Sequence, residues 1–428
     1  MKTIKFIDLF AGLGGTRLGF EQACDELGFK SECVFTSEIK PYAVKIYQCN
    51  FNNEVVFGDI TQINEKDIPS FDYLLGGFPC QAFSTAGKKM GFDDTRGTLF
   101  FDIVRIIKYH QPKGFLLENV EGLVTHDRKN NTSKIGNTLQ TILDTLMALG
   151  YQVTWRVLNA KDFGIPQDRK RVYIIGHQNN LPSLDNFAFR KATFKDIKES
   201  NLPSIDSEFT HCLLNLYDNP NQLLGKSIKD KRGGNNNIHS WDLELKGKIS
   251  NEQKELMSIL LKERRKKKWA ELKGIVWMDG MPLTLDEIHS FNLHIEKEYL
   301  KSMLDDLVSK KYLRFEYPKD QVIENGKTKR VYATHLEKGY NIVTGKLSFE
   351  LNKILDDNNV APTIVATEAD RLGVLDTTGI RRLSERECLR FFGFPENYQS
   401  NIKYNELYDL IGNTVVVPVI KEVAKRLL

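Results

Sequence analysis

The sequence predicts an α/β fold, in which a mostly parallel sheet has helices on both faces and is interrupted by a smaller inserted domain. Two observations predict this architecture. Short apolar runs alternate with segments of helical spacing through about the first 180 residues, and such alternation is typical of a parallel sheet. From about residue 180 to about residue 360 the alternation stops and Asn, Asp, Lys and Gly become dense, before apolar patterns return.

The elements of the first domain follow in order. A buried strand, TIKFIDLF, leads through a glycine-rich turn into the helix GGTRLGFEQACDELGF. The next helix begins near Pro41, a residue favoured in the first helical turn. A short strand in VVFGDIT precedes Asp59. The remaining elements are the strands ECVFTSE, FDYLLGG, GFLLENV and RVYIIG and the helices KPYAVKIYQCNF, GTLFFDIVRIIKYH and NTLQTILDTLMALG.

These changes in residue pattern and composition divide the chain into three parts. We predict a first domain at 1–180, an inserted domain at 181–360, and a return to the first domain at 361–428. The last segment, GNTVVVPVIKEVAKRLL, is apolar and is expected to be helical after Pro418, so that the C-terminal helix completes the first domain.

The composition bounds the function. There are 60 lysines and arginines against 56 aspartates and glutamates, a net charge of +4, which permits a nucleic-acid partner without requiring one. None of the six cysteines forms a C-x-x-C pair, which argues against zinc and dithiol sites, and we expect no metal. The scattered cysteines suggest a reducing compartment. With no signal-peptide pattern and no apolar run long enough for a membrane span, a cytoplasmic location is expected.

The first strand turn carries features of a ligand site. In FIDLFAGLGG, Gly12 and Gly14 allow the backbone close to a ligand, but Arg17 replaces the third glycine of the G-x-G-x-x-G fingerprint. Glu38 and Asp59 end the next strands, at the sheet edge where open α/β folds bind ligands. Together these residues indicate a cofactor that contains a nucleoside. A tight turn with nothing bound and solvated acids remains the alternative.

A lone cysteine follows a third strand end. Cys80 lies in GGFPCQAFSTAGKKMGF, where the glycines would let the loop move as a lid. Two further strand ends supply Glu118 and the pair Arg169 and Arg171, so that a thiol, a carboxyl and a guanidinium meet at one edge. Such a set suits attack on an electron-poor ring. The alternatives are a buried structural cysteine, a solvated Glu118, and arginines paired with acids at positions 162 and 168.

In these pieces the chain closely resembles the DNA (cytosine-5)-methyltransferases of bacterial and phage restriction–modification systems. The matching segments run in the family's order over about residues 3–180 and 360–428. They are DLFAGLGG, GGFPCQAFSTAGKKMGFDDTRGTLFFD, ENVEGL, FGIPQDRKRVYIIG, RRLSERECLRFFGFPENY and LIGNTVVVPV. The 181–360 insert stands where this family carries its variable target-recognition region.

The resemblance implies a Rossmann-like fold that binds S-adenosyl-L-methionine. It implies that Phe10 packs on the adenine, that Glu38 binds the ribose, and that Asp59 and Ile60 read the adenine. Ile39 is a departure, because some members place a tryptophan there. The other expected cofactor contacts are Ala11, Gly12, Gly14, Pro79, Leu99, Asn413 and Val415.

The resemblance also implies the chemistry. The Cys80 thiolate attacks carbon 6 of a cytosine that has left the duplex, Glu118 holds ring nitrogen 3 and the amine, and Arg171 holds the ring oxygen, with Arg169 in support. The methyl group then reaches carbon 5. Gln81, Ser84 and Arg96 belong to the loop expected to close on DNA.

The insert has no family motif and is interpreted from its residues. The run KERRKKKW (Lys262–Trp269), at the end of the expected helix NEQKELMSILLKERRKKKWAEL, is either a solvated helix face or a phosphate contact. The segment from PLTLDEIHSF to YNI reads as a short helix, a longer amphipathic helix and two strands around a basic tip, an order that resembles a winged-helix module. In the polar loop RGGNNNIHSWD, Arg232 and Asn235 are candidate base contacts, with a plain surface loop as the alternative.

We therefore expect a DNA (cytosine-5-)-methyltransferase acting as a monomer on a short double-stranded DNA site, with a restriction endonuclease as its genetic partner. Three alternatives stay open. The first is an RNA (tRNA) cytosine-5 methyltransferase, against which the long insert argues. The others are a nicotinamide-dependent oxidoreductase, which the incomplete glycine fingerprint disfavours, and an inactive DNA-binding relative, which the presence of Cys80, Glu118 and Arg171 disfavours.

Overall fold

The computed structural model describes residues 2–78, 99–128, 134–277, 279–324, 327–344 and 349–428. The chain forms two compact units. The first comprises 1–199, 356–370 and 383–428, and the second comprises 200–355 and 371–382. The first unit thus continues past the expected boundary near residue 180, and the chain enters the second unit twice.

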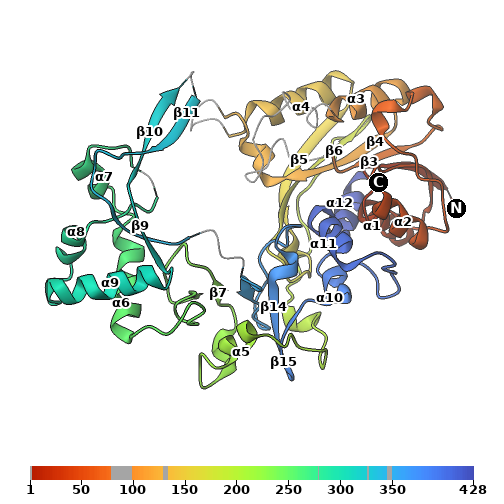
Figure 1. Ribbon diagram of the computed structural model, residues 1–428. Helices are drawn as coiled ribbons and strands as arrows, with labels where there is room; N and C mark the ends of the chain where they lie inside the picture. The colour runs from red at the N-terminus through yellow and green to blue at the C-terminus, as the bar shows by residue number, and fades with distance from the viewer. Residues whose placement is uncertain (1, 79–98, 129–133, 278, 325–326, 345–348) are drawn as a thin grey trace. The chain divides into compact units, whose positions relative to one another are not determined.

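The first unit is built on a six-stranded sheet in the order β2-β1-β3-β4-β6-β5 (Figure 1). β1 pairs in parallel with β2 and β3, and β3 pairs in parallel with β4, whereas β6 runs antiparallel to both β4 and β5. The expectation of a mostly parallel sheet is therefore confirmed. The strands are β1 (Thr3–Leu9), β2 (Lys30–Ser37), β3 (Tyr73–Gly76), β4 (Gly114–Val120), β5 (Gln152–Asn159) and β6 (Lys170–His177).

Helices cover both faces of this sheet (Figure 1). On one face, α3 (Leu99–His110) and α4 (Asn137–Ala148) pack apolar side chains against those of the strands in one continuous core. On the other, α12 (Val417–Leu427) contacts α1 (Gly15–Glu26), β4 and β6. A Cβ on Gly19 of α1 would lie 2.6 Å from Ile420, so the two helices approach too closely for a larger residue there. The chain's last segment therefore belongs to the first unit.

Two elements differ from the sequence predictions for this unit. The strand expected in VVFGDIT is a single bridge between Ser37 and Phe57. Pairing ends there because the Asp59 carboxylate accepts a hydrogen bond from the Thr61 N–H and starts the short 3-10 helix η1 (Ile60–Gln62). β5, which the sequence analysis did not find, lies at the sheet edge, where its residues are only partly buried and give a weak apolar signal.

Residues 181–199 belong to the first unit because their aromatic side chains pack there. Phe194 stacks on Phe391 with ring centroids 5.5 Å apart, and Phe187 meets Phe163 edge-on at 5.3 Å. Lys198 adds an ion pair with Asp357 at 2.7 Å. In the part of the chain described by the structure, no helix is long and apolar enough to cross a membrane.

The second unit contains a five-stranded sheet of short strands in the order β15-β14-β13-β7-β8. Its core includes the side chains of Leu213, Ile354 and Ile380, and α5 (Glu208–Leu214) packs on it. The polar loop of the sequence analysis, RGGNNNIHSWD, in fact contributes β8. The strands are β7 (Ser227–Ile228), β8 (Asn237–Ile238), β13 (Lys353–Ile354), β14 (Leu372–Asp376) and β15 (Gly379–Arg382).

The rest of the second unit has its own apolar core. The single helix expected from 251 onward is two helices, α6 (Asn251–Glu263) and α7 (Lys268–Lys273). It breaks because Arg264 turns inward, where its Nη1 donates to Asn341 Oδ1 at 2.7 Å, and Trp269 turns inward to donate to the Glu263 carbonyl at 2.8 Å. α8 (Leu285–His289), α9 (Lys297–Ser309), β9 (Leu313–Glu316), β10 (Lys319–Glu324), β11 (Lys327–Tyr332) and β12 (Gly339–Ile342) follow.

Candidate active site

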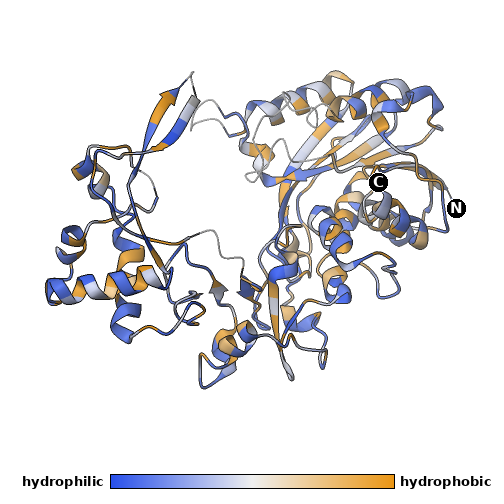
Figure 2. Cartoon of the chain, viewed as in Figure 1, coloured by the Kyte–Doolittle hydropathy of each residue, from blue (hydrophilic) through white to orange (hydrophobic). Residues whose placement is uncertain are grey.

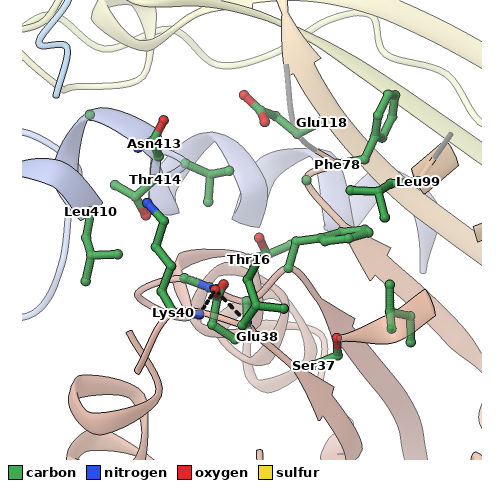
Figure 3. Close-up of a pocket in the computed structure, with 18 of the residues that line it drawn as sticks. Thr16, Ser37, Glu38, Lys40, Phe78, Leu99, Glu118, Leu410, Asn413 and Thr414 are labelled. Atoms are coloured by element: carbon green, nitrogen blue, oxygen red, sulfur yellow. Dashed lines mark hydrogen bonds between the residues drawn. The ribbon is translucent and has the colours of Figure 1, made fainter. Parts of the chain in front are cut away.

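A cavity of about 230 Å³ lies in the first unit, lined by residues that follow several strands of the main sheet and by the segment before α12. Figure 3 shows Glu38 and Glu118 on opposite sides of it, with Leu410, Asn413 and Thr414 along a third. Its lining consists of Phe10, Ala11, Gly12, Thr16, Ser37, Glu38, Ile39, Lys40, Asp59, Ile60, Gly77, Phe78, Leu99, Glu118, Val120, Arg169, Arg171, Leu410, Gly412, Asn413, Thr414 and Val415.

The turn after β1 presents its backbone to the cavity. Phe10 has a φ of 58°, a left-handed conformation that is strained for a bulky residue and is typical of functional sites. The turn is fixed by a hydrogen bond from the Ala11 N–H to the Ser37 carbonyl at 3.1 Å. Gly12, with a φ of 53°, donates its N–H to Glu38 at 2.9 Å.

Glu38 is held by backbone donors. One carboxylate oxygen accepts from Gly12, and the other accepts from the N–H groups of Ile39 and Lys40 at 2.8 and 2.9 Å. Hydrogen bonds to an ionised carboxylate are stronger than neutral ones, so these three fix the side chain in one position at the cavity wall (Figure 3). The remaining lone pairs of the carboxylate are available to hydroxyl groups of a ligand.

The wall next to Glu38 is formed by Asp59 and Ile60. Asp59 accepts from both the N–H and the hydroxyl of Thr61, at 3.0 and 2.9 Å. Arg105 of α3 donates to the Ile60 carbonyl at 2.6 Å and pairs with Glu65 at 2.8 Å. These contacts tie the short turn to α3 and hold its polar edge beside the cavity.

The C-terminal wall is held by Arg169. Its guanidinium donates to the carbonyls of Ile364, Gly412 and Thr414 at 3.0, 3.1 and 2.8 Å, and it is buried. Arg169 therefore positions the segment that carries Asn413 and Val415. This geometry differs from the expected same-face pair of arginines, because β6 begins at Lys170 and only Arg171 has the strand's alternation.

Glu118 and Arg171 meet across neighbouring strands. The Arg171 Nε lies 3.1 Å from Glu118 Oε1, and both side chains are largely buried, at 14% and 12% exposure. Burial raises the pKa of Glu118 above its usual range, while the positive charges of Arg171 and Arg169 oppose the rise. The site thus holds a carboxyl group that is more readily protonated than one in water, beside a fixed positive charge, an arrangement that suits general acid catalysis on a polar ring.

Comparison with known proteins identifies the family. A family model described as C-5 cytosine-specific DNA methylase matches residues 4–428. The chain belongs to this family. It is 57% identical to the type II methyltransferase M.NlaIV of Neisseria lactamica, over 100% of this chain and 99% of that protein. It is 41% identical to the type II methyltransferase M.HgiCI of Herpetosiphon aurantiacus, over 98% and 96%.

A solved structure supports the fold. The Entamoeba histolytica methyltransferase EhMeth matches with a TM-score of 0.53 and 17% identity, covering 100% of this chain and 98% of that chain. The expected α/β methyltransferase fold, the DNA (cytosine-5-)-methyltransferase activity and the restriction–modification type are therefore confirmed.

S-adenosyl-L-methionine is accordingly the methyl donor of this methyltransferase, and the cavity fits it. Phe10 and Ile60 offer apolar surface for a base, while Glu38 and Asp59 offer acceptors for hydroxyl and amine hydrogens. Such a pairing of apolar walls with a few convergent polar groups is typical of cofactor sites. Among the described residues, no group of three His, Cys, Asp or Glu side chains could hold a metal ion.

The structure brings together most of the residues singled out by sequence. Gly14 is an exception, because it caps α1 with a φ of 72° and a Cβ there would lie 2.4 Å from the Phe51 ring, while the residue itself is not in the cavity wall. Pro79, Cys80, Gln81, Ser84 and Arg96 lie outside the described residues. Arg232 and Asn235 are exposed in the second unit.

Several cavity residues were missed by sequence reasoning. Lys40 forms an ion pair with Asp409 at 2.6 Å, and the Tyr42 hydroxyl donates to the same oxygen at 2.6 Å. No pattern in the sequence connects positions so far apart. The sequence could have indicated Gly412 and Thr414, because they flank Asn413 in the motif LIGNTVVVPV.

Proposed function

We propose that this methyltransferase modifies carbon 5 of one cytosine within a short, specific site of double-stranded DNA, through a covalent bond between Cys80 and the ring. The observation that carries the proposal is the Glu118–Arg171 pair, which opens into the same cavity as Phe10, Glu38 and Asp59. A group that can protonate a base and a site that fits a nucleoside cofactor therefore share one cavity.

The cofactor would be held by the walls described above. The Phe10 ring would pack on the adenine, Glu38 would accept the ribose hydroxyls, and Asp59 and Ile60 would contact the adenine edge. Ala11, Gly12, Leu99, Asn413 and Val415 line the remainder of the cavity. When bound, S-adenosyl-L-methionine supplies an electrophilic methyl group on its sulfonium centre.

The protein's residues would activate the cytosine. Cys80, as a thiolate, adds to carbon 6 and pushes electron density toward carbon 5. Glu118 donates a proton or hydrogen bond at ring nitrogen 3, while the Arg171 guanidinium stabilises the ring oxygen. After methylation, loss of the carbon 5 proton expels the Cys80 thiolate and restores the aromatic ring. Acid catalysis by Glu118 would contribute roughly 10²–10⁴-fold.

The cytosine must leave the base stack to reach these groups, at a cost of about a few kcal/mol. Gln81, Ser84 and Arg96 would contact the DNA from which it is extruded. Sequence choice would come from the second unit, since the family's motifs lie in the first. The modification would protect host DNA from a partner restriction endonuclease, with the methyltransferase acting as a monomer.

The proposal is tested by expressing the chain in a methylation-free host and sequencing its plasmid DNA after bisulfite treatment. The expected result is complete protection of one cytosine in every copy of a short sequence, and none in a host expressing Cys80→Ala. Purified protein given tritiated S-adenosyl-L-methionine should label duplex DNA and leave tRNA unlabelled. Labelling of tRNA alone would overturn the proposal, as would full activity of the C80A variant.

A further inference from the structure

Residues 250–344 of the second unit are arranged in the order of a winged-helix module. After α6 and α7 the chain pairs Leu283 with Tyr340 of β12 in an isolated bridge, then forms α8, α9 and β9, which pairs with β12. A Cβ on Gly339 would lie 2.5 Å from the Leu283 backbone, so the bridge requires glycine at that position. Between β9 and β12 the chain extends into a two-stranded ribbon, β10–β11 (Figure 1). The major groove of DNA admits either a helix or such a ribbon, so α9 and the ribbon are the two candidates for contact.

The outward face of α9 argues against its entry into DNA. Glu298 and Asp305 are exposed on it, and Lys301 is paired with Asp305 at 2.6 Å. The Tyr299 hydroxyl donates to Glu252 of α6 at 2.7 Å. A helix with these carboxylates would meet the phosphates of DNA with like charge. Its two lysines are already paired, Lys301 with Asp305 and Lys297 with Asp286 of α8.

The ribbon has two chemically different faces. Residues directly opposite in an antiparallel pair share a face, and the register sets Lys319 opposite Tyr332, Gln321 opposite Arg330, and Ile323 opposite Thr328. We call these six residues the basic face. None of them is acidic, and Ile323 at its outer end is 82% exposed. Figure 2 shows the ribbon as a mixture of hydrophobic and hydrophilic segments.

The opposite face carries both acids of the ribbon, and its base contacts the rest of the unit. Asp320 accepts a hydrogen bond from the Val276 N–H at 2.9 Å, which ties this face to the segment after α7. Lys329 is paired with Glu324 at 3.1 Å. The basic face is therefore the one without acids, and Thr328 and Arg330 on it are exposed.

The side chains of the basic face suit a DNA groove. Among the described residues the Arg330 guanidinium has no hydrogen bond or ion pair, and it lies opposite Gln321 in the pair register. Arginine and glutamine are the side chains that bind guanine and adenine edges with two hydrogen bonds. Lys319 lies with its ammonium 4.8 Å from the centroid of the Tyr332 ring, at the base of the same face.

We propose that the basic face of the β10–β11 ribbon enters a groove of duplex DNA, with Arg330 and Gln321 at base edges and Lys319 at a phosphate. The inference rests on the proposed function, in which duplex DNA is the substrate. The sequence left open whether a helix or a loop contacts the DNA, and the proposal assigns this contact to the ribbon. The run Lys262–Trp269 has no such role. In that run Arg264 is buried, Arg265 is paired with Asp279 at 2.6 Å, and Lys266 is paired with Glu263.

The test compares the binding of two labelled duplexes by fluorescence anisotropy at several salt concentrations. One duplex carries the site found by bisulfite sequencing, and the other has one base pair of that site changed, with each base pair of the site changed in turn. The variants are Arg330→Ala, Gln321→Ala and Lys319→Ala, with Lys329→Ala on the opposite face as the matched control. Thermal unfolding and S-adenosyl-L-methionine binding, unchanged from wild type, establish that each variant is folded.

For at least one changed base pair, we expect the ratio of affinities for the two duplexes to fall about 10-fold or more in R330A, because the lost contact is made to a base. K319A should weaken both duplexes equally and reduce the salt slope by about one. K329A should match wild type within about twofold. The inference would be overturned if R330A kept the wild-type ratio of affinities for the two duplexes at every base pair of the site. It would also be overturned if K329A lost as much discrimination as R330A. The proposed function fails separately, through wild-type protein that leaves duplex DNA unmethylated.

Discussion

Arg171 Nε lies 3.1 Å from Glu118 Oε1, although the two residues belong to strands that run in opposite directions. The antiparallel pairing of β6 with β4 sets Arg171 opposite Val120 and Glu118 opposite Tyr173, so that Glu118 and Arg171 lie diagonally on one face. If β6 were parallel to β4, its first residues would lie beside the amino end of β4, and Arg171 would be far from Glu118. The single reversed strand is therefore what joins the acid to the guanidinium.

Glu118→Gln should reduce methyl transfer by roughly 10²–10⁴-fold, because an amide cannot protonate the ring. Binding of S-adenosyl-L-methionine should stay near the wild-type value, since Glu38 and Asp59 are untouched. In the wild type, burial raises the pKa of Glu118, and the protonated form is the active one, so the rate should fall as pH rises through that raised pKa. A pH–rate profile of single-turnover methylation measures this fall. An E118Q variant that keeps the wild-type rate, or the wild-type fall with rising pH, would contradict the assignment of Glu118 as the acid.

Asp8 should make the protein less stable at alkaline pH. It is fully buried at the end of β1, and neither carboxylate oxygen has a hydrogen-bond partner in the described residues. Burial raises its pKa from 3.8 to about 8, so the folded state holds a proton that the unfolded state releases. The contribution of Asp8 to the free energy of unfolding is therefore highest below its unfolded pKa, falls as pH rises toward 8, and is lowest above it.

Asp8→Asn removes this titration. Between pH 5 and about pH 8.5 its melting temperature should fall less than that of the wild type. Asp72→Asn is the matched control, because burial at Asp72 is outweighed by Lys113 and the Lys5 N–H, which lower its pKa. Asp72 therefore titrates below this pH window, and D72N should keep the wild-type pH dependence within it. Equal pH dependence in D8N and wild type would show that Asp8 does not hold its proton in the folded state.

The sequence predicted that the residues after β1, Glu38 and Asp59 share one edge of the sheet, because these signals are local. Glycines, strand ends and acids follow one another within 60 residues, and parallel strands bring their ends to one edge. Arg17, which replaces the third glycine of the G-x-G-x-x-G fingerprint, has a structural role. Its guanidinium pairs with Glu54 and Glu21 and lies 4.2 Å from the centroid of the Phe51 ring, so the residue that breaks the glycine pattern joins α1 to α2 (Pro41–Asn50) instead.

The remaining features depend on contacts that sequence cannot register. The role of Arg169 required its three carbonyl partners, which lie 195 to 245 residues away along the chain. The broken helix at Arg264 required knowledge that Asn341 would accept its guanidinium. In both cases the sequence predicts an exposed charged side chain, but the side chain is buried because the fold supplies hydrogen-bond acceptors from distant segments. No local sequence pattern indicates those acceptors.

Glu38→Gln should weaken S-adenosyl-L-methionine binding by roughly 10- to 100-fold, because hydrogen bonds to a charged acceptor are worth about 1.5–3 kcal/mol. The amide also sets its own N–H groups against those of Gly12, Ile39 and Lys40, which now all donate to the carboxylate. Equilibrium dialysis with labelled cofactor measures the loss. Glu26→Gln, a change at an exposed ion pair with Lys425, is the control and should bind as wild type. Unchanged affinity in E38Q would remove Glu38 from the cofactor site.

Arg169→Lys tests whether this residue positions the C-terminal wall or acts on the base. A lysine keeps the charge but cannot reach the Ile364, Gly412 and Thr414 carbonyls together, and each lost hydrogen bond to a charged donor costs about 1.5–3 kcal/mol. If the residue positions the wall, the melting temperature and the affinity for S-adenosyl-L-methionine should both fall, while kcat at saturating cofactor recovers most of the wild-type value. Lys170→Ala, which alters only an exposed pair with Glu121 at 3.7 Å, should change none of these quantities. A large loss of kcat with unchanged melting temperature and cofactor affinity would instead place Arg169 in direct contact with the cytosine.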